Sequence, residues 1–186
     1  MKNFIQLLAF YFLLFGYNYS KAEELEIGIS QGSVKPTPIA ITDFYSQEMK
    51  AIKLGKNISD VIANNLERSG LFIPKDKKSF IQDNESLNKQ PRFEDWKLIK
   101  AEHLVAGIIN IQNNSINIEF RLYDVLSQKQ LTGKRYETSE NNWRRVAHII
   151  SDEIFERITG DGGYFDTRVV YIAESGPPGK KQKRLA

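Results

Sequence analysis

The chain has 186 residues, with 26 lysines and arginines against 23 acidic residues, and it has no cysteine. The absence of cysteine excludes disulfide bonds, a thiol nucleophile and a lipidated amino-terminal cysteine. Without the basic residues of its first 22 and last seven positions, the chain carries a net negative charge. This argues against a nucleic-acid-binding protein, which needs a clustered basic face.

The first 22 residues predict a secretory signal peptide. Lys2 supplies a positive start, Phe4–Phe15 is apolar except for Gln6, and Ser20-Lys21-Ala22 places small residues before a cleavage point. A membrane anchor is the alternative, but this apolar run is shorter than the roughly 20 residues that a spanning helix needs. We therefore expect export, with cleavage after Ala22.

The expected mature chain begins with Glu23–Ile29, whose sequence is E-E-L-E-I-G-I. Leu25, Ile27 and Ile29 alternate with polar or small residues, as in a strand. An extended strand with unpaired edges can add to the sheet of another protein, so this segment is a candidate partner-binding site. The turn-forming residues of Gln31–Pro38 predict a flexible connection behind it.

The next part predicts a strand, a helix and a second strand. The strands are expected over Pro38–Phe44 and Leu71–Ile73, and the helix carries apolar residues at helical spacing from Leu54 to Leu66. Asn57 is the expected cap of this helix and Gly70 its end.

A polar stretch and a short helix follow. Lys75–Gln90 predicts a long surface loop. Phe93, Trp96 and Ile99 are spaced three apart, which favours a short helix with one apolar side. Core packing is the expected role of Trp96, and also of Trp143 further along the chain.

Three strands and a long helix complete this part of the chain. The strands are expected over His103–Ile111, Ser115–Asp124 and Gln130–Thr138, with Asn113-Asn114 as a hairpin turn. The amphipathic helix runs from Trp143 to Ile158. The order of elements predicts an α/β (α+β) fold, a mixed sheet with two to three packed helices.

Gly160–Gly163 joins this helix to a further predicted strand, Tyr164–Ile172. A phosphate-binding loop would need a helix after the glycines, so a helix cap and linker is the better interpretation. Ser175–Gly179 predicts a turn, and Arg184–Ala186 would begin a return strand. Too little chain follows Tyr164–Ile172 to cover it, so we expect an aggregation-prone or disordered carboxyl terminus.

Few residues suggest chemistry. His148 and Asp152 are four apart on one helix face, which fits half of a metal site or, more simply, a hydrogen-bonded pair. His103 opens a strand, where packing accounts for it. The carboxylates show no spacing that implies shared acid–base work. An exported α/β enzyme and a small ligand- or nucleic-acid-binding module remain as alternatives to a binding protein.

Four stretches carry a resemblance to a known family. They are N-L-E-R-S-G-L-F-I-P from Asn65, W-K-L-I-K-A-E-H-L-V-A-G from Trp96, W-R-R-V-A-H-I-I-S-D-E-I-F-E-R-I-T-G from Trp143, and G-Y-F-D-T-R-V-V-Y-I from Gly163. Together they resemble the TolB family, the periplasmic component of the Tol–Pal system of Gram-negative bacteria.

The resemblance implies a non-enzymatic periplasmic scaffold without cofactors or metals, which supports invagination of the outer membrane at cell division and its integrity. The family has an amino-terminal α/β domain and a six-bladed β-propeller. Its mature amino terminus binds the inner-membrane protein TolA, and its propeller binds the lipoprotein Pal. The TolA-binding residues correspond here to Glu23, Glu24, Leu25, Glu26, Ile27, Gly28 and Ile29.

The resemblance also divides the chain into four parts. We expect a signal peptide over 1–22, a partner-binding segment and linker over 23–38, the α/β domain over 39–160, and a linker with the truncated first blade of a propeller over 161–186. A blade takes roughly 40 to 45 residues. The Pal-binding part of the propeller is therefore expected to be absent from this sequence.

Overall fold

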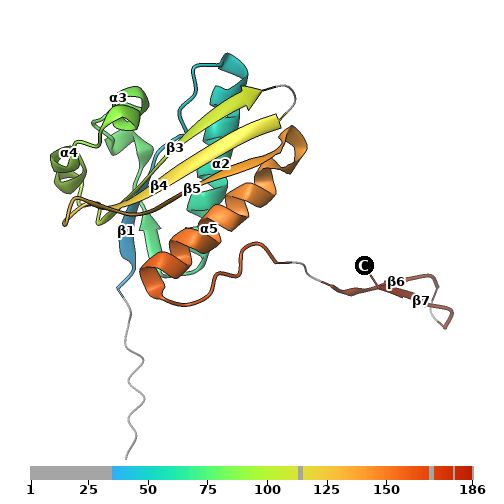
Figure 1. Ribbon diagram of the computed structural model, residues 1–186. Helices are drawn as coiled ribbons and strands as arrows, with labels where there is room; N and C mark the ends of the chain where they lie inside the picture. The colour runs from blue at the N-terminus through green and yellow to red at the C-terminus, as the bar shows by residue number, and fades with distance from the viewer. Residues whose placement is uncertain (1–34, 113–114, 168–169, 178, 186) are drawn as a thin grey trace, which may run out of the picture. The chain divides into compact units, whose positions relative to one another are not determined.

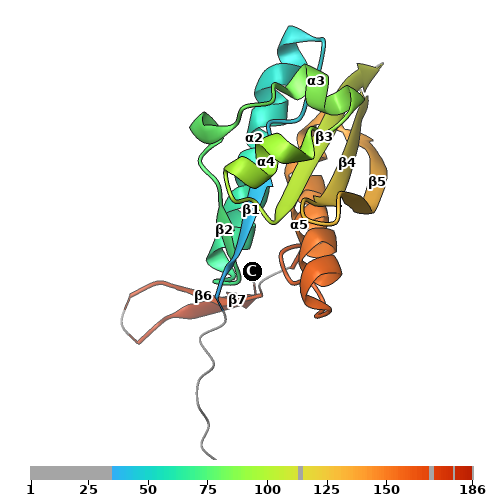
Figure 2. The ribbon, with the colours of Figure 1, turned by 90° about the vertical axis from the view of Figure 1, so that its left-hand side faces the viewer.

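The computed structural model describes residues 35–112, 115–167, 170–177 and 179–185. The described part of the chain contains a five-stranded sheet in the order β2-β1-β3-β4-β5, whose strands are labelled in Figure 2. The strands are β1 (Thr37–Ile41), β2 (Phe72–Pro74), β3 (His103–Gln112), β4 (Ser115–Asp124) and β5 (Lys129–Ser139). The α-helices are α2 (Met49–Arg68), α3 (Asn84–Lys89), α4 (Phe93–Leu98) and α5 (Trp143–Thr159), and two short 3₁₀ helices are η1 (Lys77–Ser79) and η2 (Glu140–Asn142).

The sheet is mixed, as the order of elements predicts. β1 lies between β2 and β3 and runs parallel to both of them. β3, β4 and β5 form an antiparallel meander, in which His103 pairs with Asp124 at one end and Gln112 pairs with Ser115 at the other. Parallel strands that follow one another in the chain require crossover connections. The connection from β1 to β2 contains α2, and the connection from β2 to β3 contains η1, α3 and α4.

Helices cover both faces of the sheet (Figures 1 and 2). On one face, α2 and α5 bury Ile58, Ile62 and Ile150 against apolar residues of the strands. On the other face, α3 and α4 bury Leu87 and Trp96 against β1, β3 and the end of β4. Because successive residues of a strand point to opposite faces, Ile39 belongs to the first core and Ala40 to the second.

α2 begins earlier than its apolar periodicity predicts. It starts at Met49 after Glu48, so Asn57 lies inside the helix, and the prediction that Asn57 caps it is wrong. The apolar pattern does not reveal this start because Met49 and Ile52, in the first turn, are exposed and lie outside the buried stripe. The end agrees better with the prediction, since Gly70 adopts a positive φ of 74° just after the helix.

The stretch Lys75–Gln90 is not the surface loop that its polarity predicts. It contains η1 and α3, and Gln82 and Leu87 within it are buried. The Gln82 side chain accepts hydrogen bonds from the indole nitrogen of Trp96 at 3.1 Å and the backbone nitrogen of Arg92 at 2.8 Å. The buried side-chain amide of Gln82 thus ties this segment to α4. Polar composition alone predicts a loop here because it does not show that Gln82 is buried and hydrogen-bonded.

The strand predicted over Tyr164–Ile172 is also wrong for every described residue of that stretch except the last, Ile172. Tyr164–Thr167 is irregular, and strand structure begins only at β6 (Ile172–Ser175). β6 forms an antiparallel hairpin with β7 (Gln182–Leu185), so β6 does have a second strand beside it, and the return strand starts before Arg184. The predicted turn between them is confirmed by positive φ angles at Gly176 and Gly179. The Asn113-Asn114 turn lies outside the described residues.

Candidate functional site

The predicted partner-binding residues Glu23–Ile29 lie outside the described residues, as do the predicted signal peptide and most of the predicted connection. The structure does describe where that connection joins the sheet. The backbone nitrogen of Thr37, the first residue of β1, donates to the carbonyl of Leu71 at 2.8 Å. The candidate segment is therefore tethered to a strand that has neighbours on both sides. No helix among the described residues is long and apolar enough to span a membrane.

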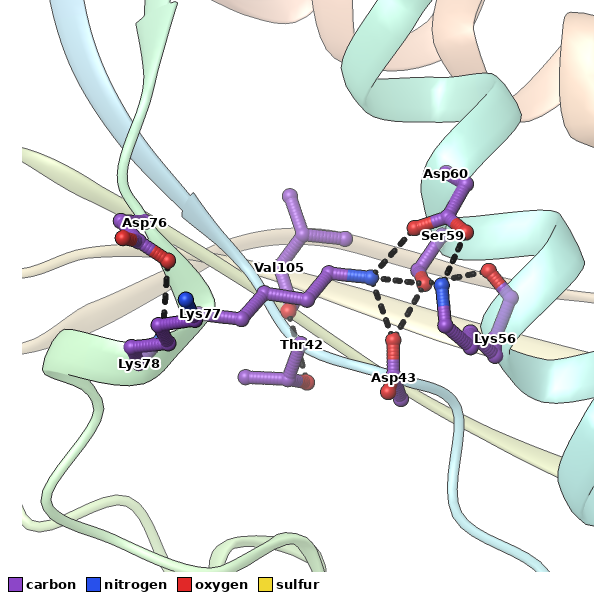
Figure 3. Close-up of polar contacts among 9 residues, drawn as sticks. All are labelled: Thr42, Asp43, Lys56, Ser59, Asp60, Asp76, Lys77, Lys78 and Val105. Atoms are coloured by element: carbon purple, nitrogen blue, oxygen red, sulfur yellow. Dashed lines mark hydrogen bonds and ion pairs between the residues drawn. The ribbon is translucent and has the colours of Figure 1, made fainter.

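A polar cluster forms at the carboxyl ends of the parallel strands β1 and β2, where α/β sheets commonly hold ligands (Figure 3). Lys77, which follows β2, points its ammonium group at Asp43, which follows β1, and at two residues of α2. It donates to Asp43, to the hydroxyl of Ser59 at 2.8 Å and to Asp60 at 2.7 Å. The sequence alone shows Asp43 and Asp60 as scattered carboxylates, because no local spacing announces a contact made by tertiary folding.

Asp60 is the most strongly engaged carboxylate of this cluster. Lys56, one helical turn before it, donates to its second oxygen at 2.5 Å. Partial burial would raise the pKa of Asp60, but the hydrogen bonds from Lys56 and Lys77 outweigh burial and hold that pKa below its usual value. The hydrogen bond to Asp60 in turn raises the pKa of Lys56. The cluster is thus most stable with its carboxylate ionised.

The contact between Ser59 and Lys77 has the composition of a serine–lysine catalytic pair, but its geometry does not suit catalysis. A general base needs a free lone pair, and Lys77 donates to two carboxylates and one hydroxyl. Ser59 is fully buried, so its hydroxyl is out of reach of a substrate. We interpret the cluster as a structural tie that joins α2 to the ends of β1 and β2.

A hollow of about 630 Å³ opens beside this cluster. It is bordered by the loop after β1, the first turns of α2 and the start of α3, and Phe44, Met49 and Ile52 give it an apolar lining. Met49 and Ile52 are 85% and 49% exposed, so this lining faces solvent. Lys53 lies on the α2 side of the rim and Asp83 on the α3 side.

The predicted pair of His148 and Asp152 does not form. Nδ1 of His148 instead lies 2.8 Å from the side-chain amide of Asn65 on α2. The Asp152 carboxylate accepts hydrogen bonds from the backbone nitrogens of Phe165 and Asp166. Among the described residues, no group of three or more histidine, aspartate or glutamate side chains is placed to hold a metal ion. The half metal site suggested by the sequence therefore has no counterpart in this part of the chain.

The remaining predicted residues have structural roles. Trp96 is fully buried, as expected, whereas Trp143 is half-buried, packs against the main core and carries the Arg144 guanidinium 4.9 Å from its ring centre. Arg144 itself is exposed, as a residue outside the apolar stripe of α5 should be. His103 is half-buried and its Nδ1 has no hydrogen-bond partner. Gly160 ends α5 with a φ of 81°, which confirms the helix cap.

These observations define the class of the protein as a mixed α/β domain with an amino-terminal segment tethered to a central strand. Residues 25–131, more than half of the chain, match the family model described as the TolB amino-terminal domain, and the chain belongs to this family. The resemblance carried by the sequence motifs is therefore confirmed.

The crystal structure of TolB from Acinetobacter baumannii is similar in fold, with a TM-score of 0.66 and 23% sequence identity over 82% of this chain. The match covers 36% of that TolB chain, so the present chain spans about a third of its length.

Two further structures are less similar. A hypothetical protein from Chlamydia trachomatis has 16% identity and a TM-score of 0.47, over 67% of this chain and 96% of that one. A PelC dodecamer from Paraburkholderia phytofirmans has 12% identity and a TM-score of 0.43, over 68% of this chain and 90% of that one. Similarity at this level carries no functional argument.

Proposed function

We propose that the protein is a non-enzymatic periplasmic component of the Tol–Pal system that acts through protein–protein contacts. Membership of the TolB amino-terminal domain family carries this proposal, and the family match includes Leu25–Ile29 of the candidate binding segment. The paired state of the Lys77 cluster supports it, since the clearest constellation of polar groups in the described residues is occupied by its own contacts.

The proposed binding element is Glu23–Ile29, exposed by removal of residues 1–22. We propose that it adds as a strand to the sheet of a TolA-like inner-membrane protein. In such a strand, Leu25, Ile27 and Ile29 face one side and would pack against the partner, while Glu24 and Glu26 face the other. The seven residues between Ile29 and Thr37 span at most about 25 Å when extended, so the partner would dock near the amino end of β1.

The direct test measures the affinity of the mature protein for a TolA carboxyl-terminal domain by titration calorimetry. Deletion of residues 23–29 should weaken binding by about 100-fold or more, because it removes every backbone hydrogen bond of the added strand. Unchanged affinity would overturn the proposal. Replacement of Ile27 by Asp should weaken binding strongly, whereas Glu26→Gln, on the other side of the strand, is the matched control and should change it little.

The cellular role proposed for the complete protein follows from the same family membership. A protein with this domain and a carboxyl-terminal propeller would connect a TolA-like protein to a Pal-like lipoprotein, and so support outer-membrane invagination and integrity during division. Candidate binding residues are proposed here only for the TolA side. A complementation assay in cells that lack TolB tests the cellular role, because restored outer-membrane integrity should require both binding surfaces.

A further inference from the structure

We propose that Tyr164–Asp166 forms a latch that closes a glycine hinge, Gly160–Gly163, against α5. The sequence of this hinge is G-D-G-G, which by itself favours a flexible joint. In the structure the chain turns back after α5, and the residues that follow the hinge make specific contacts with its side. These contacts do not depend on the proposed partner.

The polar part of the latch centres on Asp152. Its two carboxylate oxygens accept hydrogen bonds from two successive backbone nitrogens, Phe165 at 2.6 Å and Asp166 at 3.0 Å. Hydrogen bonds to an ionised acceptor are about twice as strong as those between neutral groups. Arg145, two turns earlier on α5, reaches the Asp166 carboxylate at 3.2 Å. Two charged residues of α5 thus fix the backbone and a side chain of the same short segment.

The apolar part of the latch centres on Phe155, which is 5% exposed. The rings of Tyr164 and Phe165 lie edge-on to it, with centroid distances of 5.4 Å and 5.8 Å. Phe165 also packs against the main hydrophobic core. Edge-to-face aromatic pairs of this kind stabilise a fold beyond the effect of their buried area. The latch is therefore an extension of the core and does not rest on surface charges alone.

The hinge itself shows why glycines stand there. Gly160 has a φ of 81°, which other residues adopt only with strain. At Gly163 a Cβ atom would lie 2.4 Å from the Asp152 side chain, so the latch closes only with a residue that lacks a side chain. A Cβ atom at Gly162 would have no neighbour within 4 Å. While the latch is closed, it fixes the direction in which the chain leaves the domain, and its opening would free a hinge.

The two glycines provide a matched test. Gly163→Ala should force the latch open, whereas Gly162→Ala should leave it closed, although both variants add one methyl group to the same joint. Amide hydrogen exchange followed by NMR reports on the latch through Phe165 and Asp166. We expect their protection to fall on the order of tenfold or more in Gly163→Ala and to stay unchanged in Gly162→Ala, with α5 unaffected in both. Equal behaviour of the two variants, or unprotected amides in the native protein, would overturn the proposal.

A second measurement follows the hinge directly. Because the chain has no cysteine, spin labels can be placed specifically at Glu67→Cys on α2 and Thr167→Cys beyond the latch. Their distance distribution should be narrow in the otherwise native protein and clearly broader in Asp152→Ala, which removes both acceptors. An equally narrow distribution in the variant contradicts the proposal. If Asp152→Ala fails to fold, the same pair of labels is measured in Gly163→Ala and in Gly162→Ala. The distance distribution should then broaden in Gly163→Ala and stay narrow in Gly162→Ala.

Discussion

The side-chain amide of Asn65 on α2 donates to Nδ1 of His148 on α5 at 2.8 Å, and its second hydrogen reaches the Ser151 hydroxyl at 2.9 Å. Ser151 in turn donates to the carbonyl of Ala147. Asn65 is 4% exposed, so this polar group is taken out of water with both of its hydrogens satisfied. The two long helices are therefore joined by a specific network as well as by apolar packing.

Replacement of Asn65 by Ala should lower the free energy of unfolding by about 1–3 kcal/mol, because it removes two buried hydrogen bonds and leaves two acceptors without their donor. The neighbouring exposed Asn64 offers a matched control, since Asn64→Ala makes the same chemical change in the same helix. Urea denaturation of the two variants measures the difference. Equal effects would mean that helix propensity, and not the network, accounts for the change.

Gly55→Ala should destabilise the protein although alanine favours helices more than glycine does. A Cβ atom at position 55 would lie 2.1 Å from the carbonyl oxygen of Phe44, which belongs to the backbone and cannot rotate away. Overpacking costs about 1–3 kcal/mol, and an approach this close to fixed backbone belongs at the upper end, above the helix-propensity gain of about 1 kcal/mol. Thermal unfolding, compared with the exposed Lys53→Ala variant of the same helix, checks the sign. A rise in melting temperature would contradict this account of the close approach.

The ion-pair cluster should make the free energy of unfolding depend on pH in the acid range. The pKa of Asp60 is held below its usual value, so the folded state binds a proton at this carboxylate less readily than the unfolded state does. The contribution of Asp60 is therefore present above the ordinary pKa of about 4 and is lost as the pH falls below it. Asp60→Asn should flatten the decline of stability in that range. Glu67→Gln, which removes an exposed carboxylate from the same helix, is the matched comparison, and an equal change in the two variants would contradict this account.

His103 should make the free energy of unfolding depend on pH closer to neutrality as well. Burial lowers the pKa of His103, while the nearby carboxylates Asp124 and Glu102 act in the opposite direction and do not compensate. The folded state thus disfavours the protonated ring, and stability falls as the pH drops below the ordinary histidine value of about 6.5. His103→Gln should reduce the loss of unfolding free energy between about pH 7.5 and pH 5. An unchanged loss would assign this pH dependence to other groups.

The sequence predicts the sheet well because β3, β4 and α5 have strong periodic patterns of apolar residues. It predicts the start of α2 and the whole of α3 poorly, since these depend on one exposed first turn and on the buried amide of Gln82. The contacts among Lys77, Asp43 and Asp60 join residues that are 17 and 34 positions apart. No local pattern indicates such contacts. The motifs of the family, by contrast, are readable in the sequence, and they alone point to the Glu23–Ile29 segment as a TolA-type site.

The position of β1 has a mechanical consequence for a protein that is held by its amino terminus. A pull transmitted to Thr37 would act along the axis of a strand that pairs with β2 on one side and β3 on the other. The hydrogen bonds of both ladders would then be loaded together in shear, whereas an edge hairpin pulled at its end opens one bond at a time. Single-molecule stretching from residue 35 should therefore require a larger force than stretching applied across the β6–β7 hairpin. Under the proposed function, tension from the partner would enter the domain through a strand that is held by two ladders.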